Sequence, residues 1–242
     1  MLKTQTRFAD AHCHLDLIKN PDQAVNDAKF NNLELIITAG VDSQSNKKTV
    51  ELAKGIVFGV VGISPDNALS DGTNVEEIES MIKASRNMVG IGEVGLDLTV
   101  ADKVNLNIQR DVFTKQVEIA YSMELPIVVH SRKTIDETLS IIKDHGIKNA
   151  VFHFFEGDEQ QAKKIESYGY KISIPPALSS KRRRVIRAVD LESLFSETDS
   201  PVVGKTPSDV ITVVTEIASL KGVSIEDAGE TITKSIKDYF YI

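Results

Sequence analysis

The chain of 242 residues is 41% hydrophobic and 26% charged, an ordinary balance for a soluble globular protein. Its formal net charge of −7 argues against a protein that coats nucleic acid non-specifically, but it leaves room for an enzyme that binds phosphate locally. The only cysteine, Cys13, excludes an intramolecular disulfide, and no apolar run approaches the ~18 residues of a membrane span, so we expect a cytoplasmic protein without a membrane partner.

Short apolar runs rich in β-branched residues alternate with amphipathic stretches along the chain. The predicted strands are Arg7–Ala11, Leu33–Ala39, Val57–Ile63, Met88–Glu93, Pro126–His130, Ala150–Phe154, Tyr170–Ile174 and Leu194–Glu197. The predicted helices are Asp22–Phe30, Ser43–Ala53, Val75–Ser85, Val104–Tyr121, Ile135–His145, Glu159–Tyr168, Ser179–Val189, Ser208–Leu220 and Ser224–Tyr239. Each strand is nearly continuously apolar, which is typical of strands buried on both faces.

Eight strand–helix pairs in this length predict an α/β protein, built as a single (β/α)₈ TIM barrel with an extra C-terminal helix. We expect one domain over residues 1–242. A doubly wound open sheet has the same alternation and is the alternative. The Gly-x-Gly-x-x-Gly fingerprint of a dinucleotide fold is absent from the first strand–helix turn, which favours the barrel.

The first strand leads into the run Asp10-Ala11-His12-Cys13-His14. Side chains alternate between the two faces of a strand, so His12 and His14 should point the same way and could ligate one metal ion. Asp10 has the same parity, and its carboxylate could fix the tautomers of the two imidazole rings.

Further metal-ligating residue types lie at the ends of later strands. They are Glu93, His130, His153 and Asp199. The carboxyl ends of barrel strands converge on one mouth, whatever their separation in sequence. Four of the five histidines and two carboxylates would therefore gather there, which is enough to hold two divalent ions with one carboxylate bridging them.

Five short motifs occur in order along the chain: Asp10–Asp16, Gly92–Asp97, His130–Arg132, His153–Gly157 and Glu197–Pro201. Together they resemble the successive signatures of the TatD family of metal-dependent hydrolases. The resemblance runs from about residue 7 to residue 201. It implies a TIM-barrel member of the amidohydrolase superfamily with DNase or other phosphodiesterase activity.

The resemblance also implies a set of ligands for two divalent ions, which would be Mg, Mn or Zn. One ion would be held by His12, His14 and Asp199, the second by His130 and His153, with Glu93 bridging the two. The chain also departs from the family pattern, which usually has Gly-x-His-Pro-His after the third strand. Here the sequence is Gly62-Ile63-Ser64-Pro65-Asp66, so Ser64 and Asp66 replace two imidazoles that would face the substrate.

Two bound cations would lower the pKa of a shared water, and Asp199 would accept its proton as general base. Glu93 and Asp199 are thus the expected catalytic residues. Arg132 has the same parity as His130 and could bind a phosphate, or it could form an ion pair at the rim.

Two other features could contact a nucleic acid substrate. The run Lys181-Arg182-Arg183-Arg184 opens the helix after the seventh strand, where such barrels often bind phosphate; a solvated helix face is the alternative. Phe154 and Phe155 could stack a base or could pack within the barrel or its loops.

We therefore hypothesise a divalent-metal-dependent hydrolase of phosphodiester bonds, most simply a monomeric TatD-like DNase acting on DNA or another phosphodiester substrate. One alternative is a metal-dependent ester or amide hydrolase on the same barrel, including a D-aminoacyl-tRNA deacylase. Another is a non-catalytic metal-binding scaffold. Glu93 and Asp199 weigh against the scaffold, because a structural site needs fewer ligands and no water-bearing position.

Overall fold

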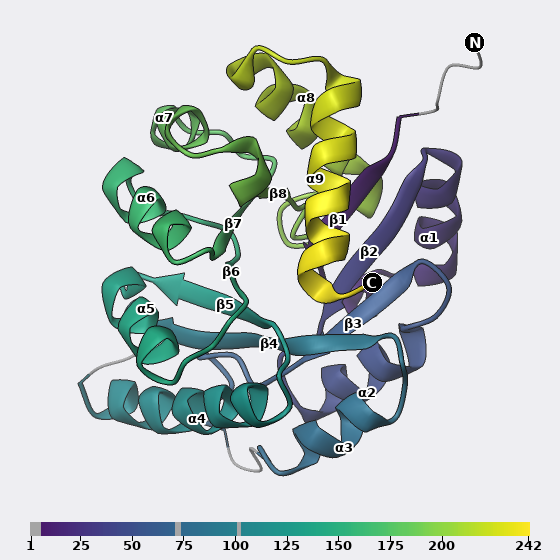
Figure 1. The fold of residues 1–242 in the computed structure, drawn as a ribbon. Coiled ribbons are helices and arrows are strands. Elements are labelled where there is room, and N and C mark those ends of the chain that lie inside the picture. Colours follow the sequence, from purple (N-terminus) through teal and green to yellow (C-terminus); the bar gives the residue numbers. More distant parts are fainter. Residues whose placement is uncertain (1–5, 71–73, 101–102) are drawn as a thin grey trace.

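The computed structural model describes residues 6–70, 74–100 and 103–242 and contains one eight-stranded parallel sheet (Figure 1). The strands follow one another in the sheet in the order of the sequence. They are β1 (Phe8–Cys13), β2 (Leu33–Ala39), β3 (Val57–Val61), β4 (Met88–Asp97), β5 (Ile127–Arg132), β6 (Ala150–Phe152), β7 (Lys171–Ile174) and β8 (Leu194–Ser196).

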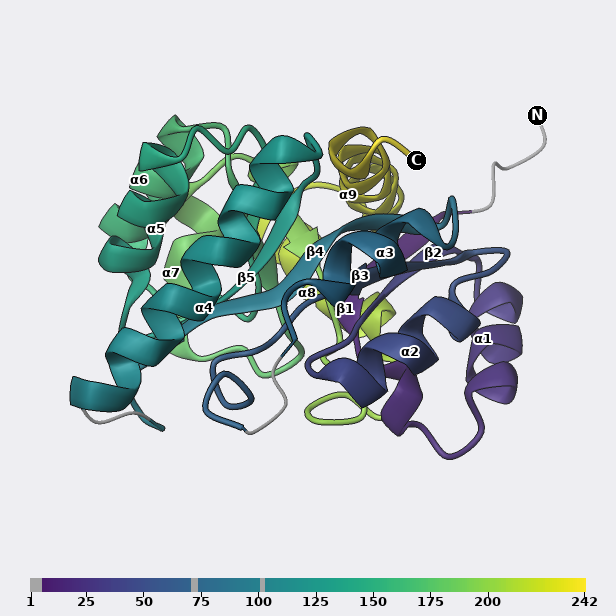
Figure 2. The same cartoon turned by 90° about the horizontal axis from the view of Figure 1, so that it is seen from below.

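A helix follows each strand and packs on the outside of the sheet, as the two perpendicular views show (Figures 1 and 2). The helices are α1 (Pro21–Phe30), α2 (Ser43–Leu52), α3 (Glu77–Lys83), α4 (Lys103–Ser122), α5 (Ile135–Asp144), α6 (Glu159–Ser167), α7 (Ser180–Ala188), α8 (Val210–Lys221) and α9 (Ile225–Phe240). Within the described residues, no helix is long and apolar enough to cross a membrane. The predicted (β/α)₈ barrel with an additional C-terminal helix is confirmed.

The ends of three strands differ from the predicted ones. Strand β1 continues to Cys13, and β4 continues to Asp97, because its last four residues pair with the end of β5 up to Arg132. Strand β6 is shorter than predicted and ends at Phe152. Two residues later, Phe154 has φ 47°, which carries the chain out of the extended conformation.

Two of the strands contain a bulge next to the residues of interest. Between Ile91 and Val94 of β4, three steps along the strand correspond to two along β5. The same shift occurs between Asp10 and Cys13 of β1, against β2. A bulge of this kind changes the direction of the side chains beyond it, so simple alternation no longer predicts where each one points.

The barrel is closed between β1 and β8 by hydrogen bonds that involve both side chains and backbone. Ser196 Oγ donates to the carbonyl of Ala9 at 2.9 Å, and Thr198 Oγ1 donates to Asp10 Oδ2 at 2.6 Å. Further along, the amide of Asp199 donates to the carbonyl of His12 at 2.9 Å. This closure places the chain after β8 directly beside the end of β1.

Helix α9 covers the end of the barrel opposite to the ends of the strands that carry the histidines. The carbonyl of Arg7 lies 2.7 Å from the position that a Cβ on Gly229 would occupy, so α9 lies close against the beginning of β1. At its other end, the Tyr239 hydroxyl accepts from the amide of Ala150 at 2.8 Å. The helix therefore connects the beginnings of β1 and β6 and seals the core from below.

Candidate metal centre

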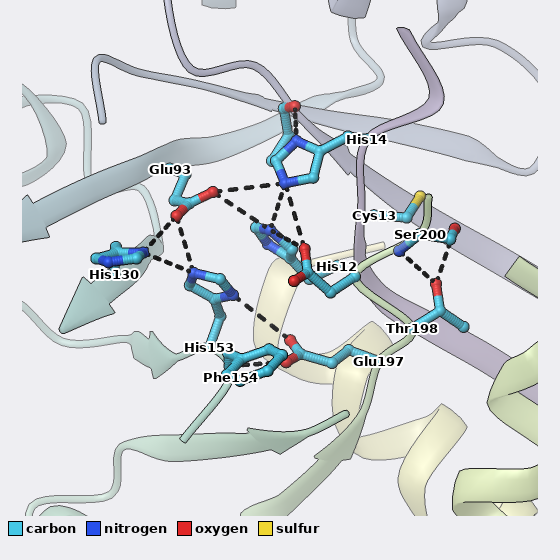
Figure 3. Close-up of polar contacts among 12 residues, drawn as sticks. His12, Cys13, His14, Glu93, His130, His153, Phe154, Glu197, Thr198 and Ser200 are labelled. Atoms are coloured by element: carbon cyan, nitrogen blue, oxygen red, sulfur yellow. Dashed lines mark hydrogen bonds and ion pairs between the residues drawn. The ribbon is translucent and has the colours of Figure 1, made fainter. Parts of the chain in front are cut away.

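The two histidines of β1 converge at its carboxyl end, as predicted (Figure 3). Their Nε2 atoms lie 3.3 Å apart, and both residues are buried. The Nδ1 atom of His14 lies 3.0 Å from the carbonyl oxygen of Ala39. Since a carbonyl only accepts, this contact holds the proton on Nδ1 and leaves the Nε2 lone pair of His14 free for a cation.

Two carboxylates complete this group of atoms. Asp199 Oδ1 lies 3.4 Å from His14 Nε2 and 3.9 Å from His12 Nε2. Glu93 Oε2 lies 3.5 Å and 3.6 Å from the nitrogens of His12 and His14, respectively. Bonds of about 2.0–2.2 Å from a tetrahedral cation to its ligands would separate those ligands by roughly 3.3–3.6 Å. Four donor atoms are thus spaced as one divalent cation requires.

The other oxygen of Glu93 faces a second pair of histidines. Oε1 lies 2.7 Å from Nδ1 of His130 and 2.9 Å from Nε2 of His153, and these two nitrogens are 3.4 Å apart. Glu93 therefore stands between two sets of nitrogens, one facing each of its oxygens. Imidazole and carboxylate donors in this arrangement suit a pair of divalent transition-metal ions or Zn²⁺.

The nitrogen of His130 that points away from Glu93 is held by Asp97. His130 Nε2 lies 3.2 Å from Asp97 Oδ2, and Asp97 Oδ1 accepts from both the amide and the hydroxyl of Thr99 at 2.6 Å. Gln109 on α4 in turn accepts from the Asp97 amide at 2.9 Å. Asp97 thereby fixes the orientation of the His130 ring.

The carboxylates of the centre raise the pKa of two of its histidines. Burial opposes the charged form of both rings, but Asp97 and Glu93 raise the pKa of His130 to about 10, and Asp199 and Glu93 raise that of His14 to about 9. His12 differs, because burial and the neighbouring His153 lower its pKa to about 4.

Both carboxylates that face the histidines stay ionised. Burial alone would raise the pKa of Glu93, but three surrounding histidines hold it well below its usual range. The hydrogen bond from His14 likewise outweighs burial and lowers the pKa of Asp199. Each carboxylate is therefore available as an anionic ligand at neutral pH.

Glu197 is a buried carboxyl group behind His153. Its Oε1 accepts from the amide of Phe154 at 2.7 Å, and its Oε2 accepts from Ser173 Oγ at 2.5 Å. Burial raises the pKa of Glu197 to about 7. His153 Nδ1 is 3.9 Å from Glu197 Oε2, and the His153 ring stacks on that of His12 with centroids 4.0 Å apart. Glu197 thus shapes the loop that follows β6.

The expectation that Asp10 orients the imidazole rings is wrong. Its carboxylate accepts from the amide and hydroxyl of Thr198 and, at 3.3 Å, from the backbone amide of His12. The bulge in β1 separates Asp10 from the two histidines, so the parity argument does not extend across it. Asp10 instead joins β1 to the chain after β8.

The centre lies in a cavity of about 410 Å³ at the carboxyl ends of the strands. Arg132 lines it, as expected for a residue two positions after His130, and its Nε is 3.9 Å from Glu156 Oε2. Ser64 and Asp66 also line this cavity. The rim thus combines one arginine with the carboxylates of Asp66 and Glu156.

The four cations of the Lys181–Arg184 run point to separate partners, and none of them lines the cavity. Lys181 Nζ donates to the carbonyl of Glu156, whereas Arg183 and Arg184 form ion pairs with Glu216 and Glu159 on neighbouring helices. Arg182 is buried beneath the loop after β6. Phosphate binding by the whole run stays a prediction, and the geometry does not favour it.

The structure brings together the six predicted ligands from five strands or strand ends. Three groups have ligand atoms within 4.8 Å of one another in His12, His14 and Asp199, and three in His12, Glu93 and His153. Sequence reasoning missed the roles of Asp97 and Glu197. Both lie within motifs that the sequence singled out, but their partners are distant along the chain.

Comparisons with known proteins agree with this architecture. The family described as TatD related DNase matches residues 9–241. The chain is 30% identical to a metal-dependent hydrolase of Methanocaldococcus jannaschii over 247 residues, covering 97% of each protein. It is 27% identical to the human deoxyribonuclease TATDN3 over 258 residues, covering 96% of this chain and 94% of the human protein.

Solved structures show the same fold. The crystal structure of YjjV, a TatD homologue from Escherichia coli, matches with a TM-score of 0.88 at 23% identity, covering 99% of this chain and all of that one. A TatD family hydrolase from Entamoeba histolytica matches with a TM-score of 0.89 at 19% identity, covering 99% of each chain.

Proposed function

The chain belongs to the TatD family of metal-dependent hydrolases, and from this premise we propose that it cleaves phosphodiester bonds in DNA with two divalent ions. The observation that carries the proposal is the position of Glu93. One of its oxygens faces the nitrogens of β1, and the other faces those of β5 and β6, so that a single carboxylate serves two ligand sets.

The proposed ligands are those converging on the two Glu93 oxygens. They are His12, His14, Asp199 and Glu93 for one ion, and His130, His153 and Glu93 for the other. Such ions supply Lewis acidity, which activates water and stabilises charge that develops on phosphoryl oxygens. We propose Mg, Mn or Zn as the metal, with the imidazole-rich set favouring Mn or Zn over Mg.

The protein side chains would orient the substrate and move the proton. Asp199 is ionised and opens onto the cavity, so it can accept a proton from the attacking water. Arg132 is about half exposed and lies at the long distance of 3.9 Å from Glu156, so its guanidinium can turn to a phosphate oxygen of the substrate.

A second candidate substrate is an ester that carries an amino group, such as an aminoacyl ester. It is favoured by Asp66, a carboxylate on the cavity wall that would repel a second phosphate and attract an ammonium group. A matched comparison of the two substrate classes decides between them.

The test is to strip the protein of metal, reload it with Mg²⁺, Mn²⁺ or Zn²⁺, and offer single-stranded DNA, duplex DNA, p-nitrophenyl esters and aminoacyl esters. We expect metal-dependent cleavage of DNA, and a loss of about 10²–10⁴-fold in kcat for Asp199→Asn. His145→Gln is the control, because His145 lies at the end of α5 outside the cavity. Ester turnover without any cleavage of DNA would overturn the nuclease proposal, and full activity of Asp199→Asn would overturn the role of Asp199.

A further inference from the structure

The residue that follows the proposed ligand His153 is held in an unusual backbone conformation. Phe154 has φ 47°, a region that non-glycine residues seldom occupy. Its amide donates to the buried Glu197 at 2.7 Å, which holds the backbone in this turn. Phe154 lines the cavity and lies beside His153 and Glu197 (Figure 3). Strained residues of this kind concentrate where a side chain must be aimed.

The aromatic ring of Phe154 rests on a buried guanidinium. The Cζ atom of Arg182 lies 4.5 Å from the ring centroid. Arg182 itself is fixed from behind, since its Nε donates to the carbonyl of Phe155 at 3.3 Å and its Nη1 to that of Ala177 at 2.5 Å. A guanidinium that stacks on a ring while its donors are satisfied elsewhere is a rigid support for that ring.

The residue before Arg182 holds the same loop. Lys181 Nζ donates to the carbonyl of Glu156 at 2.6 Å. The first basic residues of α7 therefore fasten the loop Phe154–Glu156 instead of projecting into the cavity. This arrangement accounts for two of the four cations of the run, which the proposed metal chemistry leaves unused.

The wall of the cavity that faces substrate also carries apolar side chains. Leu17, Val202 and Val203 line it, although these side chains are 58%, 65% and 38% exposed. Exposed apolar groups around a cavity that is otherwise charged are suited to a ligand with one anionic part and one flat apolar part. A nucleotide has both.

We propose that Phe154 is the surface on which a nucleobase next to the scissile phosphate stacks, and that Arg182 is the positioning residue for its ring. The inference rests on the proposed function, because it assumes a nucleic acid substrate. Arg182 covers one face of the ring and leaves the other face for the base. Stacking of a base on an aromatic side chain typically contributes about 5- to 150-fold in affinity.

The test compares the protein and the substrate in one cycle. Short single-stranded oligonucleotides are prepared in which a tetrahydrofuran abasic residue replaces each base in turn. Phe154→Ala should lower kcat/KM on the intact oligonucleotide by about 5- to 150-fold. On the one substrate that lacks the stacking base, wild type and Phe154→Ala should agree within about twofold, because the interaction is already absent.

Further variants separate stacking from simple packing. Phe154→Leu keeps an apolar side chain and should still lose the base-dependent part, whereas Phe154→Tyr should retain it. Arg182→Met should show the same dependence on the base as Phe154→Ala, and Arg182→Lys should recover part of the loss. Phe30→Ala, at an 87% exposed phenylalanine on α1, is the matched control and should leave every substrate unaffected.

The metal content of each variant is measured alongside, and we expect it to equal that of the wild type. Equal losses on intact and abasic substrates, or no loss at all, would overturn the role of Phe154 while leaving the nuclease proposal intact. If the wild-type protein cleaves no oligonucleotide with any metal, the proposed function fails and this inference fails with it.

Discussion

The site histidines differ in what holds the nitrogen that points away from the centre. His14 is held by the carbonyl of Ala39 and His130 by the carboxylate of Asp97. His12 Nδ1 and His153 Nδ1 have no hydrogen-bond partner among the described residues. A carboxylate partner makes an imidazole a stronger donor to a metal than a carbonyl does, because it stabilises positive charge on the ring. The two proposed ligand sets are thus chemically unequal.

This inequality predicts a pH dependence of metal binding. The pKa is about 9 for His14 and about 10 for His130, so both rings carry a proton in the metal-free protein at pH 7. A metal must displace these protons, so its affinity should rise with pH by about tenfold per unit at each site between pH 6 and 8. Calorimetric titrations of Mn²⁺ in buffers of different protonation enthalpy should show about two protons released when both sites fill.

The same shifts act in the opposite direction on the metal-free fold. Both folded-state pKa values lie above the unfolded value of 6.5, so the stabilisation is fully present below pH 6.5. It is lost as the pH rises through about 9 and 10. A metal affinity that does not vary between pH 6 and 8 would contradict the protonated state of these two rings.

At the scale of elements, the decisive strand is β4. It pairs with β5 before and after a bulge, and Glu93 lies within that bulge. The strand is rich in glycine, and Gly95 is the position where the two strands meet most closely. Its φ is 146°, and a Cβ there would lie 1.9 Å from the carbonyl oxygen of His130. Only glycine permits this approach, which brings Glu93 and His130 within hydrogen-bond distance.

Gly95→Ala should therefore destabilise the protein and the centre together. The added methyl group must push β4 away from β5, and we expect a loss of about 2–4 kcal/mol in the free energy of unfolding, together with weaker metal binding. Chemical denaturation and metal titration measure the two effects.

Gly55→Ala is the matched control, because Gly55 also has a positive φ of 64°, but no atom lies within 4 Å of the position that a Cβ would occupy there. It should cost only about 1 kcal/mol and leave metal binding unchanged. Equal effects of the two substitutions would show that backbone strain alone, rather than the β4–β5 contact, governs this position.

At the scale of the whole molecule, the closure between β1 and β8 places the last ligand. Thr198 and Asp10 are both fully buried and bond to each other across this seam. The neighbouring amide of Asp199 donates to the carbonyl of His12. The position of Asp199 thus depends on barrel closure, although this residue and His12 lie near opposite ends of the sequence.

Thr198→Val should weaken this closure without changing the size of the side chain. It removes the hydroxyl that donates to Asp10 Oδ2, so a buried carboxyl oxygen loses a partner at a cost of about 1–3 kcal/mol. Thermal unfolding should show the loss, and metal affinity should fall with it. Thr215→Val on the exposed face of α8 is the control and should change stability by less than about 0.5 kcal/mol. A Thr198→Val protein as stable as the wild type would mean that the seam does not depend on this bond.

The sequence by itself determined the barrel and the identity of the converging residues. Strand and helix periods depend on neighbours along the chain, and the ends of parallel barrel strands must meet at one mouth. For this reason His12, His14 and Glu93 could be assigned to one centre before any contact was known.

Only the tertiary structure decided how the remaining residues are used. Asp10 binds across the barrel seam, Asp97 orients His130, and Arg182 supports Phe154. Each of these contacts depends on a bulge, a positive φ or a pairing between distant segments, which a local pattern does not encode. The sequence named the ligands, and the three-dimensional register of the strands determined their partners.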